Sequence, residues 1–294
     1  MRKIIVAIAL ALVTFMTALT LSAQRFEPID QLVVFGDSLS DTGTVFRATN
    51  GAYPPNPPYF QGRYSNGRVW VEYLADRLSL STSQIDNHAY GGATSSSYSN
   101  GLVPGLLSQV QSFTQTHSSV NSTALYVVWA GANDYLQGVN DATTPVKNVI
   151  EAIASLSNAG AKRVLVANLP NLGQLPATRN TANSTSLVAL TQSHNQGLRR
   201  SLKVLGQQQP DLEIAVLDAN TLYQEAITHP AKFGFTNVTD ACVSDSRACD
   251  QPQQFLFWDG IHPTTAAHQI LGEQAFAAIA EHLPLNAGVL HNKL

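Results

Sequence analysis

Five short apolar runs rich in β-branched residues, separated by helical patterns, constrain the fold of this chain most strongly. The runs are Leu32–Phe35, Ile85–Ala89, Leu125–Ala130, Val164–Leu169 and Ile214–Leu217. Three of them are almost continuously apolar, which is typical of strands buried on both faces of a parallel sheet. Helical patterns occur at Val69–Leu78, Leu106–Thr116, Val146–Ala159, Thr185–Leu205 and from Pro263 to about Leu283. This alternation predicts a three-layer α/β/α sandwich around a five-stranded parallel sheet.

The first residues have the pattern of an export signal. Arg2 and Lys3 precede an apolar run from Ile4 to Leu21, and small residues lead to Ala23. A basic start, an apolar stretch and a small-residue site are typical of a cleaved signal peptide. An uncleaved membrane anchor is the alternative, but the run contains three threonines and no charged stop follows it. We therefore predict a signal peptide over residues 1–23, a single domain over residues 24–294, and a secreted or periplasmic protein.

Composition argues against two broad classes of protein. Only 13% of the residues are charged, which is low for a disordered polyampholyte. The formal net charge is −3, and no dense run of Lys and Arg occurs. Nucleic-acid binding requires such a basic surface, so we expect no nucleic-acid partner.

Two cysteines, Cys242 and Cys249, lie in a polar segment with six residues between them. In an exported protein such a close pair is expected to form a disulfide. Two free thiols are the alternative. A metal site is less favoured, because no cluster of Cys or His residues accompanies the pair. Closing so short a loop stabilises the fold by roughly 2.5 kcal/mol, so we expect its main effect to be on local shape.

The segment from Asn50 to Arg68 contains four prolines within Tyr53–Tyr59. Prolines remove backbone donors and fix φ, so the segment can be neither a central strand nor a helix. We predict an unusually long surface loop, and loops of this length are often functional. Its aromatic and apolar residues favour a lipid-like substrate.

Residues capable of catalysis stand directly after the predicted strands. Ser38 follows the first strand, Gly92 the second and Asn133 the third, while Asp259 and His262 precede the last helix. In open parallel sheets, ligands bind at the carboxyl ends of the strands. Together these residues supply the parts that serine acyl transfer requires.

Each member of the candidate triad has a chemical role. A serine hydroxyl such as that of Ser38 is a poor nucleophile without an adjacent base, and His262 is the candidate base. Asp259 can reach the other imidazole nitrogen and fix its tautomer. Pro263 suits the first turn of the last helix, so we expect His262, directly before it, to be held on a rigid element.

The oxyanion of the reaction needs donors that are in place before charge develops. The backbone amides of Ser38 and Gly92 and the side-chain amide of Asn133 are the candidates. Taken singly, each of these residues is more often a turn or cap residue. Asp259 and His262 could likewise be a helix cap and a surface histidine. Three neighbouring aspartates are expected to cap turns around the site: Asp37, Asp41 and Asp134.

Four blocks of the sequence resemble the GDSL lipases and esterases, also called SGNH hydrolases. The blocks are Val34–Gly43, Asn87–Thr94, Gly131–Asp134 and Asp259–Pro263, and they occur in the family's order. The chain is similar to the branch of bacterial secreted phospholipases, lysophospholipases and acyltransferases. The resemblance implies a flavodoxin-like sheet and a serine esterase without a metal or an organic cofactor. It also implies roles for five residues: Ser38, Asp259 and His262 as the triad, and Gly92 and Asn133 as oxyanion donors beside the Ser38 amide.

The catalytic residues are compatible with several substrate classes. The leading hypothesis is an exported hydrolase that acts through an acyl-enzyme on lipid-like carboxylic esters. An acyltransferase to an alcohol acceptor and a carbohydrate acetyl esterase are alternatives. A catalytically silent binding protein is a further one, which the intact set of catalytic positions argues against. We expect an ester or lipid substrate, transient contact with a membrane or lipid surface, and a monomer.

Overall fold

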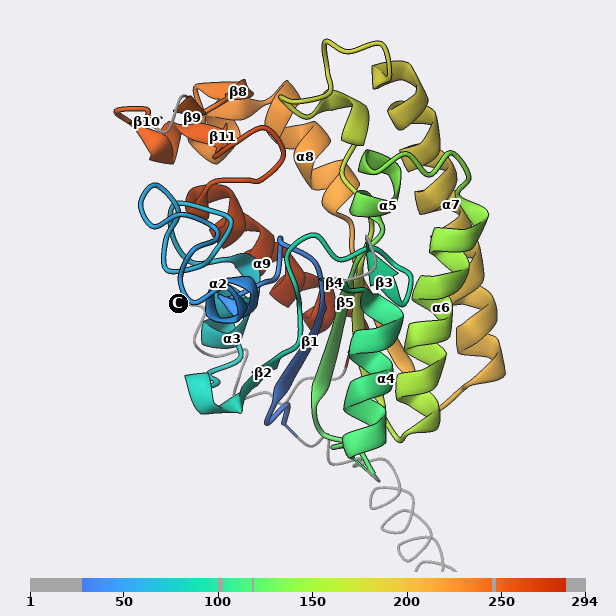
Figure 1. The fold of residues 1–294 in the computed structure, drawn as a ribbon. Helices are drawn as coiled ribbons and strands as arrows, with labels where there is room; N and C mark the ends of the chain where they lie inside the picture. The colour runs from blue at the N-terminus through green and yellow to red at the C-terminus, as the bar shows by residue number, and fades with distance from the viewer. Residues whose placement is uncertain (1–27, 100–102, 118, 245–246, 284–294) are drawn as a thin grey trace, which may run out of the picture. The chain divides into compact units, whose positions relative to one another are not determined.

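A parallel sheet of five strands forms the centre of the protein. The structure is a computed structural model and describes residues 28–99, 103–117, 119–244 and 247–283. The strands lie in the order β2 (Ile85–Asn87), β1 (Leu32–Gly36), β5 (Leu125–Trp129), β6 (Arg163–Ala167) and β7 (Glu213–Leu217) (Figure 1). Every neighbouring pair is parallel. This flavodoxin-like order confirms the predicted fold class. The predicted signal peptide over residues 1–23 lies outside the described residues.

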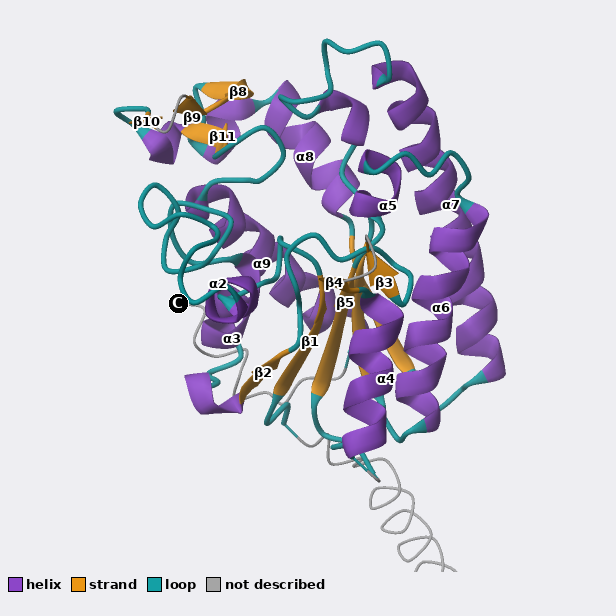
Figure 2. Ribbon diagram, in the orientation of Figure 1, coloured by secondary structure: helices purple, strands orange, loops and turns teal. Residues whose placement is uncertain are grey.

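Helices cover both faces of the sheet, as Figure 2 shows. One face packs against α4 (Leu106–Thr116), α6 (Thr143–Asn158) and α7 (Ser184–Gln208). On the other face lie α3 (Trp70–Arg77) and α9 (Thr265–His282), which pack against each other. Because successive strand residues point to opposite faces, Val33 and Phe35 join the first core. Trp129 faces the other layer, where its ring meets the edge of Trp70.

The central strands are buried on both faces, as their apolar sequences predicted. Every residue of β1, β5 and β6 is buried. Helix α6 buries a stripe of apolar residues at helical spacing, namely Val146, Val149, Ile153 and Leu156. In the part of the chain that the structure describes, no helix has both the length and the apolar character needed to cross a membrane.

Smaller elements lie around the sheet. Three short helices are α2 (Thr44–Ala48), α5 (Ala132–Leu136) and α8 (Ala219–Thr228). Paired short strands are β3 (Tyr98–Ser99) with β4 (Val103–Pro104), β8 (Asn237–Ala241) with β11 (Phe255–Phe257), and β9 (Val243–Ser244) with β10 (Arg247–Ala248). Turns of 3₁₀ helix occur at Thr82–Gln84, Leu172–Gln174, Pro230–Phe233 and Pro252–Gln254. Cys242 and Cys249 are joined by a disulfide, which confirms that prediction.

The start of the last helix was predicted wrongly. Helix α9 begins at Thr265, not at Pro263, and its N-cap is Thr264, whose hydroxyl accepts a hydrogen bond from the amide of Ala267. A threonine hydroxyl can satisfy a free amide of the first turn, which a proline cannot do, so the cap falls after Pro263. His262 therefore lies in the turn before α9 and not on the helix.

Candidate active site

Ser38 lies in the tight turn that follows β1. The turn is held by the Asp37 carboxylate, which accepts a hydrogen bond of 3.0 Å from the amide of Leu39. Gly36 ends the strand with φ +156°, and a Cβ there would lie 2.3 Å from the carbonyl oxygen of Trp129. Only glycine permits this approach of β1 to β5 at the point where the chain turns. The turn thus places Ser38 at the carboxyl end of the sheet.

The structure brings Ser38, His262 and Asp259 together in one chain of hydrogen bonds. The Nε2 atom of His262 is 2.8 Å from the Oγ of Ser38, which lies 224 residues away in the sequence. The Nδ1 atom of His262 is 2.7 Å from Oδ2 of Asp259 and 3.0 Å from Oδ1. This geometry suits an imidazole that accepts the serine proton at Nε2 while Nδ1–H donates to the carboxylate.

The Asp259 carboxylate is fixed by several donors. Its Oδ1 accepts hydrogen bonds from the amides of Ile261, at 2.9 Å, and of His262, at 2.8 Å. Its Oδ2 accepts one of 2.7 Å from the hydroxyl of Tyr59. Burial alone would raise the pKa of Asp259, but the charge of His262 and these hydrogen bonds outweigh burial and lower that pKa to about 2. The carboxylate is therefore ionised across the neutral range.

Two glycines follow β2, and the structure separates their functions. A Cβ on Gly91 would lie 2.1 Å from the hydroxyl oxygen of Tyr64, so this glycine makes room for a tyrosine. Gly92 has φ +83°, and a Cβ there would meet no atom within 4 Å. Among the described residues, the amides of Ser38 and Gly92 donate no hydrogen bond. Both amides are therefore available to an incoming oxygen atom.

Asn133 lies in the first turn of α5, directly after β5. Its Nδ2 donates a hydrogen bond of 2.9 Å to the carbonyl of Ala93, next to Gly92. The N-cap of α5 is Gly131, and no side chain caps this helix. Asn133 therefore does not act as a cap. One of its two amide hydrogens holds the glycine block, and its side chain lines the same pocket as Ser38 and His262.

The three nearby aspartates bind backbone amides, but not all of them cap their own turn. Asp37 does so, and burial raises the pKa of its carboxyl to about 6. Asp41 accepts hydrogen bonds from Gly43 and Thr44 and also from Gly91, so it joins the first block to the glycine block. Asp134 binds the amide and the hydroxyl of Ser95, so it joins α5 to the segment that follows the glycine block.

A small pocket of about 20 Å³ lies beside Ser38, His262 and Asn133. Most of its wall is apolar, formed by Leu39, Leu136, Leu172, Leu175, Tyr223 and Ile261. The apolar wall suits the hydrocarbon part of a substrate better than a charged group. Within the described ranges, no three His, Cys, Asp or Glu residues are grouped closely enough to hold a metal ion.

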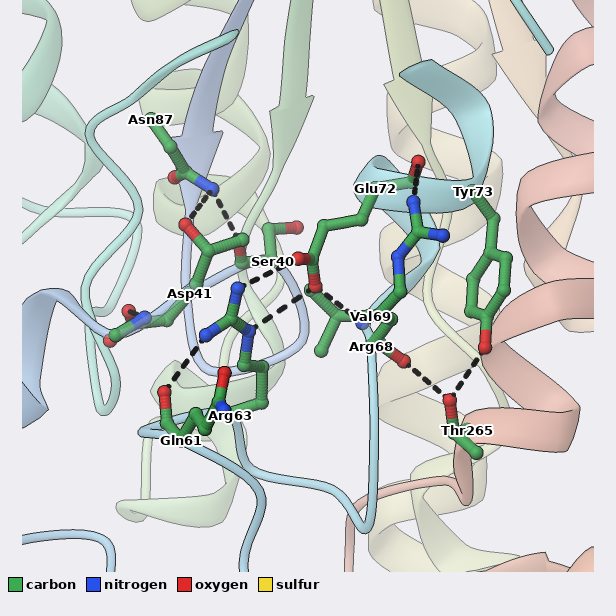
Figure 3. Close-up of polar contacts among 12 residues, drawn as sticks. Ser40, Asp41, Gln61, Arg63, Arg68, Val69, Glu72, Tyr73, Asn87 and Thr265 are labelled. Atoms are coloured by element: carbon green, nitrogen blue, oxygen red, sulfur yellow. Dashed lines mark hydrogen bonds and ion pairs between the residues drawn. The ribbon is translucent and has the colours of Figure 1, made fainter. Parts of the chain in front are cut away.

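The proline-rich loop was expected to be functional, but its direct contacts with the triad were not predicted from the sequence. Besides the contact of Tyr59 with Asp259, the ring of Tyr64 lies 5.1 Å from that of His262. An ion pair of 2.7 Å between Arg63 and Glu72 of α3 anchors the loop, and Figure 3 shows Arg63 also bound to the carbonyl of Gln61. The sequence feature that could have indicated these contacts is the density of tyrosines among the prolines.

Comparisons with known proteins agree with this geometry. Residues 32–275 match the family described as GDSL-like Lipase/Acylhydrolase. The chain is 30% identical over 318 residues to the phosphatidylcholine-sterol acyltransferase of Aeromonas hydrophila, covering 88% of this chain and 93% of that protein. It is also 30% identical over 272 residues to the secreted effector protein SseJ of Salmonella typhimurium, covering 86% of this chain and 64% of that protein.

The fold is similar to that of a solved hydrolase. The crystal structure of LAE5, an alpha/beta hydrolase enzyme from the metagenome of Lake Arreo, superposes with a TM-score of 0.52 at 16% identity. The superposition covers 87% of this chain and 97% of LAE5. The family match extends over most of the sequence and contains the blocks that carry Ser38, Gly92, Asn133 and His262. This protein belongs to the GDSL-like lipase/acylhydrolase family and is a carboxylic ester hydrolase.

Proposed function

We propose that the protein is an exported serine hydrolase that cleaves lipid-like carboxylic esters through an acyl-enzyme. The observation that carries the proposal is the hydrogen-bonded chain from Ser38 through His262 to Asp259, with distances of 2.8 Å and 2.7 Å. These atoms are in contact without any rearrangement. In this site the nucleophile, its base and the orienting carboxylate meet at the end of the sheet where ligands bind in such folds.

The first half of the reaction acylates Ser38. Its Oγ attacks the ester carbonyl while Nε2 of His262 takes the hydroxyl proton. Asp259 stays ionised and stabilises the imidazolium that forms, in keeping with the low pKa of its carboxyl. His262 then gives the proton to the leaving alcohol. In the second half, water attacks the acyl-enzyme with His262 again as the base.

The oxyanion of both steps forms beside three donors. We assign them to the amides of Ser38 and Gly92 and to the Asn133 side chain, which lines the pocket with Ser38. Donors that are already placed need no reorganisation when the charge develops. The positive φ of Gly92 orients its amide at no steric cost.

The substrate class follows from the surroundings of Ser38. The wall of the pocket is mainly apolar, and the described part of the site offers the substrate no lysine or arginine. A relative of 30% identity is a phosphatidylcholine-sterol acyltransferase. Both observations favour a fatty acyl ester over a charged one. We infer lipids such as phospholipids and lysophospholipids as substrates, and transient contact with the lipid surface that presents them.

Two other functions have a specific observation in their favour. The name of the acyltransferase relative favours transfer of the acyl group to an alcohol in place of water. The pocket volume of about 20 Å³ favours a short acyl group, as an acetyl esterase of carbohydrates would require. Both alternatives use the same acyl-enzyme mechanism. The acyltransferase differs from the lipid hydrolase in the acceptor that attacks the acyl-enzyme, and the acetyl esterase differs in the ester that forms it.

We further propose a single hydrolase domain over residues 24–294 that acts as a monomer, with residues 1–23 directing export and being cleaved off in the process. The basic and apolar pattern of the first residues supports export. So does the similarity to a secreted effector protein. N-terminal sequencing of protein recovered from the culture medium or periplasm tests this, with Gln24 as the expected first residue.

The test of the substrate is a comparison of acyl chains and acceptors. The purified protein is assayed on p-nitrophenyl esters of increasing chain length, on phosphatidylcholine and lysophosphatidylcholine, and on an acetylated sugar, each with and without added sterol. We expect kcat/KM to rise beyond the acetyl ester and the lipids to be cleaved, with Ser38→Ala inactive on all of them. Cleavage of the acetylated sugar alone would contradict the lipid assignment.

A further inference from the structure

Tyr59 reaches the candidate triad from a distant part of the sequence. Its hydroxyl donates a hydrogen bond of 2.7 Å to Oδ2 of Asp259, 200 residues away. Oδ2 is also the oxygen that accepts the bond of 2.7 Å from Nδ1 of His262. One carboxylate oxygen thus serves two donors at equal distance. The ring of Tyr59 also meets the edge of Trp258, the residue before Asp259.

The loop that carries Tyr59 is fastened to the segment around His262. The hydroxyl of Ser65 donates a hydrogen bond of 2.9 Å to the carbonyl of Pro263. The side-chain oxygen of Asn66 accepts one of 2.8 Å from the amide of Thr265. Thr265 is further bound through its hydroxyl to the carbonyl of Arg68, as Figure 3 shows. The loop and the catalytic segment therefore form one hydrogen-bonded frame in which Tyr59 has a fixed position.

We propose that Tyr59 is a positioning residue for catalysis, which holds the Asp259 carboxylate toward His262 and takes up part of its negative charge. The proposal rests on the proposed function, because it needs His262 to act as the base. It adds a fourth member to the hydrogen-bonded chain, so that Tyr59, Asp259, His262 and Ser38 act in series.

The Tyr59 hydroxyl and Nδ1–H of His262 compete for the negative charge of the same Asp259 oxygen. A hydrogen bond to a charged acceptor is stronger than one to a neutral acceptor. While Tyr59 shares Oδ2, less negative charge is available to hold a proton on His262. Without the hydroxyl, the whole charge of the Asp259 carboxylate acts on its hydrogen bond to Nδ1 of His262. The carboxylate also loses one of the bonds that fix its orientation.

Other titratable groups surround Asp259 and His262. Asp37, in the turn after β1, and His268, on α9, both interact electrostatically with His262. Burial raises the pKa of Asp37 to about 6 and lowers that of His268 to about 3. Tyr64 packs its ring against His262. None of these contacts changes when the Tyr59 hydroxyl is removed, so a difference between two pH profiles reports on Tyr59.

The first test is Tyr59→Phe, assayed for kcat, KM and pH dependence on a soluble p-nitrophenyl ester. We expect kcat at neutral pH to fall about tenfold with little change in KM, since one hydrogen bond to a charged group is lost. We also expect the acid limb of the kcat/KM profile to move to higher pH. A residue with a purely structural role would lower the melting temperature without moving this limb.

Tyr126→Phe is the matched control. The Tyr126 hydroxyl donates a hydrogen bond of 2.9 Å to the carbonyl of Asn121. The change therefore removes one hydrogen bond of a tyrosine hydroxyl that does not contact the triad. We expect a lower melting temperature, unchanged kcat and an unmoved acid limb. Replacing Tyr59 with 3-fluorotyrosine is the complementary change, because it keeps the ring but strengthens the donor. It should move the acid limb to lower pH.

An acid limb that stays in place in both Tyr59 variants would overturn the inference, as would a Tyr59→Phe enzyme with wild-type kcat. The Ser38→Ala variant separates this failure from failure of the proposed function. If Ser38→Ala is inactive while Tyr59→Phe behaves as wild type, only the role of Tyr59 is wrong. If Ser38→Ala remains active, the catalytic assignment itself is wrong.

Discussion

Asn133 offers the sharpest test of the oxyanion assignment, because neither alanine nor an ionised aspartate can donate a hydrogen bond at this position. Asn133→Ala removes a donor that we place beside the oxyanion. Loss of one such donor costs about 2.7–4 kcal/mol of transition-state stabilisation, or a fall of roughly 10²–10³ in kcat. KM should change little, because the donor meets the developing charge and not the ground-state ester.

The structure adds a separate effect on stability. The Asn133 amide donates at 2.9 Å to the carbonyl of Ala93, which is buried. Asn133→Ala leaves this carbonyl without its donor, at a cost of roughly 1–3 kcal/mol in unfolding free energy. At neutral pH, Asn133→Asp should lower both kcat and the unfolding free energy more than Asn133→Ala does. A carboxylate cannot donate to Ala93, and it repels the oxyanion.

The assay measures kcat, KM and the urea midpoint for both variants and for Gln137→Ala. Gln137 is the matched control, because its amide also donates to the glycine block, at 3.4 Å to the Gly92 carbonyl, but it does not line the pocket. We expect Gln137→Ala to keep kcat within about twofold, as is usual for surface changes. Near-normal turnover in Asn133→Asp would refute the oxyanion role of Asn133.

Two further predictions concern stability. The pKa of Asp259 in the folded protein, about 2, lies below its ordinary value of 3.8. The ionised carboxylate therefore stabilises the fold by about 2 kcal/mol above about pH 4, and this stabilisation is lost as the pH falls toward 2. Urea unfolding of wild type and Asp259→Asn should therefore converge between pH 5 and pH 2, and parallel curves would contradict this. Replacing Cys242 and Cys249 with serine should lower stability by roughly 2.5 kcal/mol. It should also lower kcat, because Cys242 and Val243 donate to the carbonyls of Phe257 and Trp258, which lead into Asp259; a variant with unchanged kcat would show that the loop does not support the site.

The strands and the main helices could be predicted because local and tertiary preferences agree there. The apolar runs of β1 and β5 can be satisfied only by burial on both faces, and both strands lie where the runs occur. Helix α4 has the predicted bounds, Leu106–Thr116. The strand ends then bring Ser38 and Asn133 to one edge of the sheet, and that step needs only the topology rule for parallel strands.

Other elements depend on contacts that no local pattern reveals. Helix α8 was missed because Asn220, Thr221 and Tyr223 are weak helix formers, although the Asp218 side chain caps its first turn at Thr221. The two-residue strands β9 and β10 lie within the disulfide loop and have no periodicity of their own. Tyr59 was missed for a related reason. Its role depends on a fold that brings a proline-rich loop against Asp259.

Every step proposed above depends on Ser38 as the nucleophile of an acyl-enzyme. The most direct measurement is reaction with a fluorophosphonate, followed by intact mass and peptide mapping. We expect one adduct per chain, on the peptide that contains Ser38, with complete loss of esterase activity. A folded Ser38→Ala variant should show no adduct and no turnover. An adduct on another residue, or comparable turnover by Ser38→Ala, would show that Ser38 is not the nucleophile.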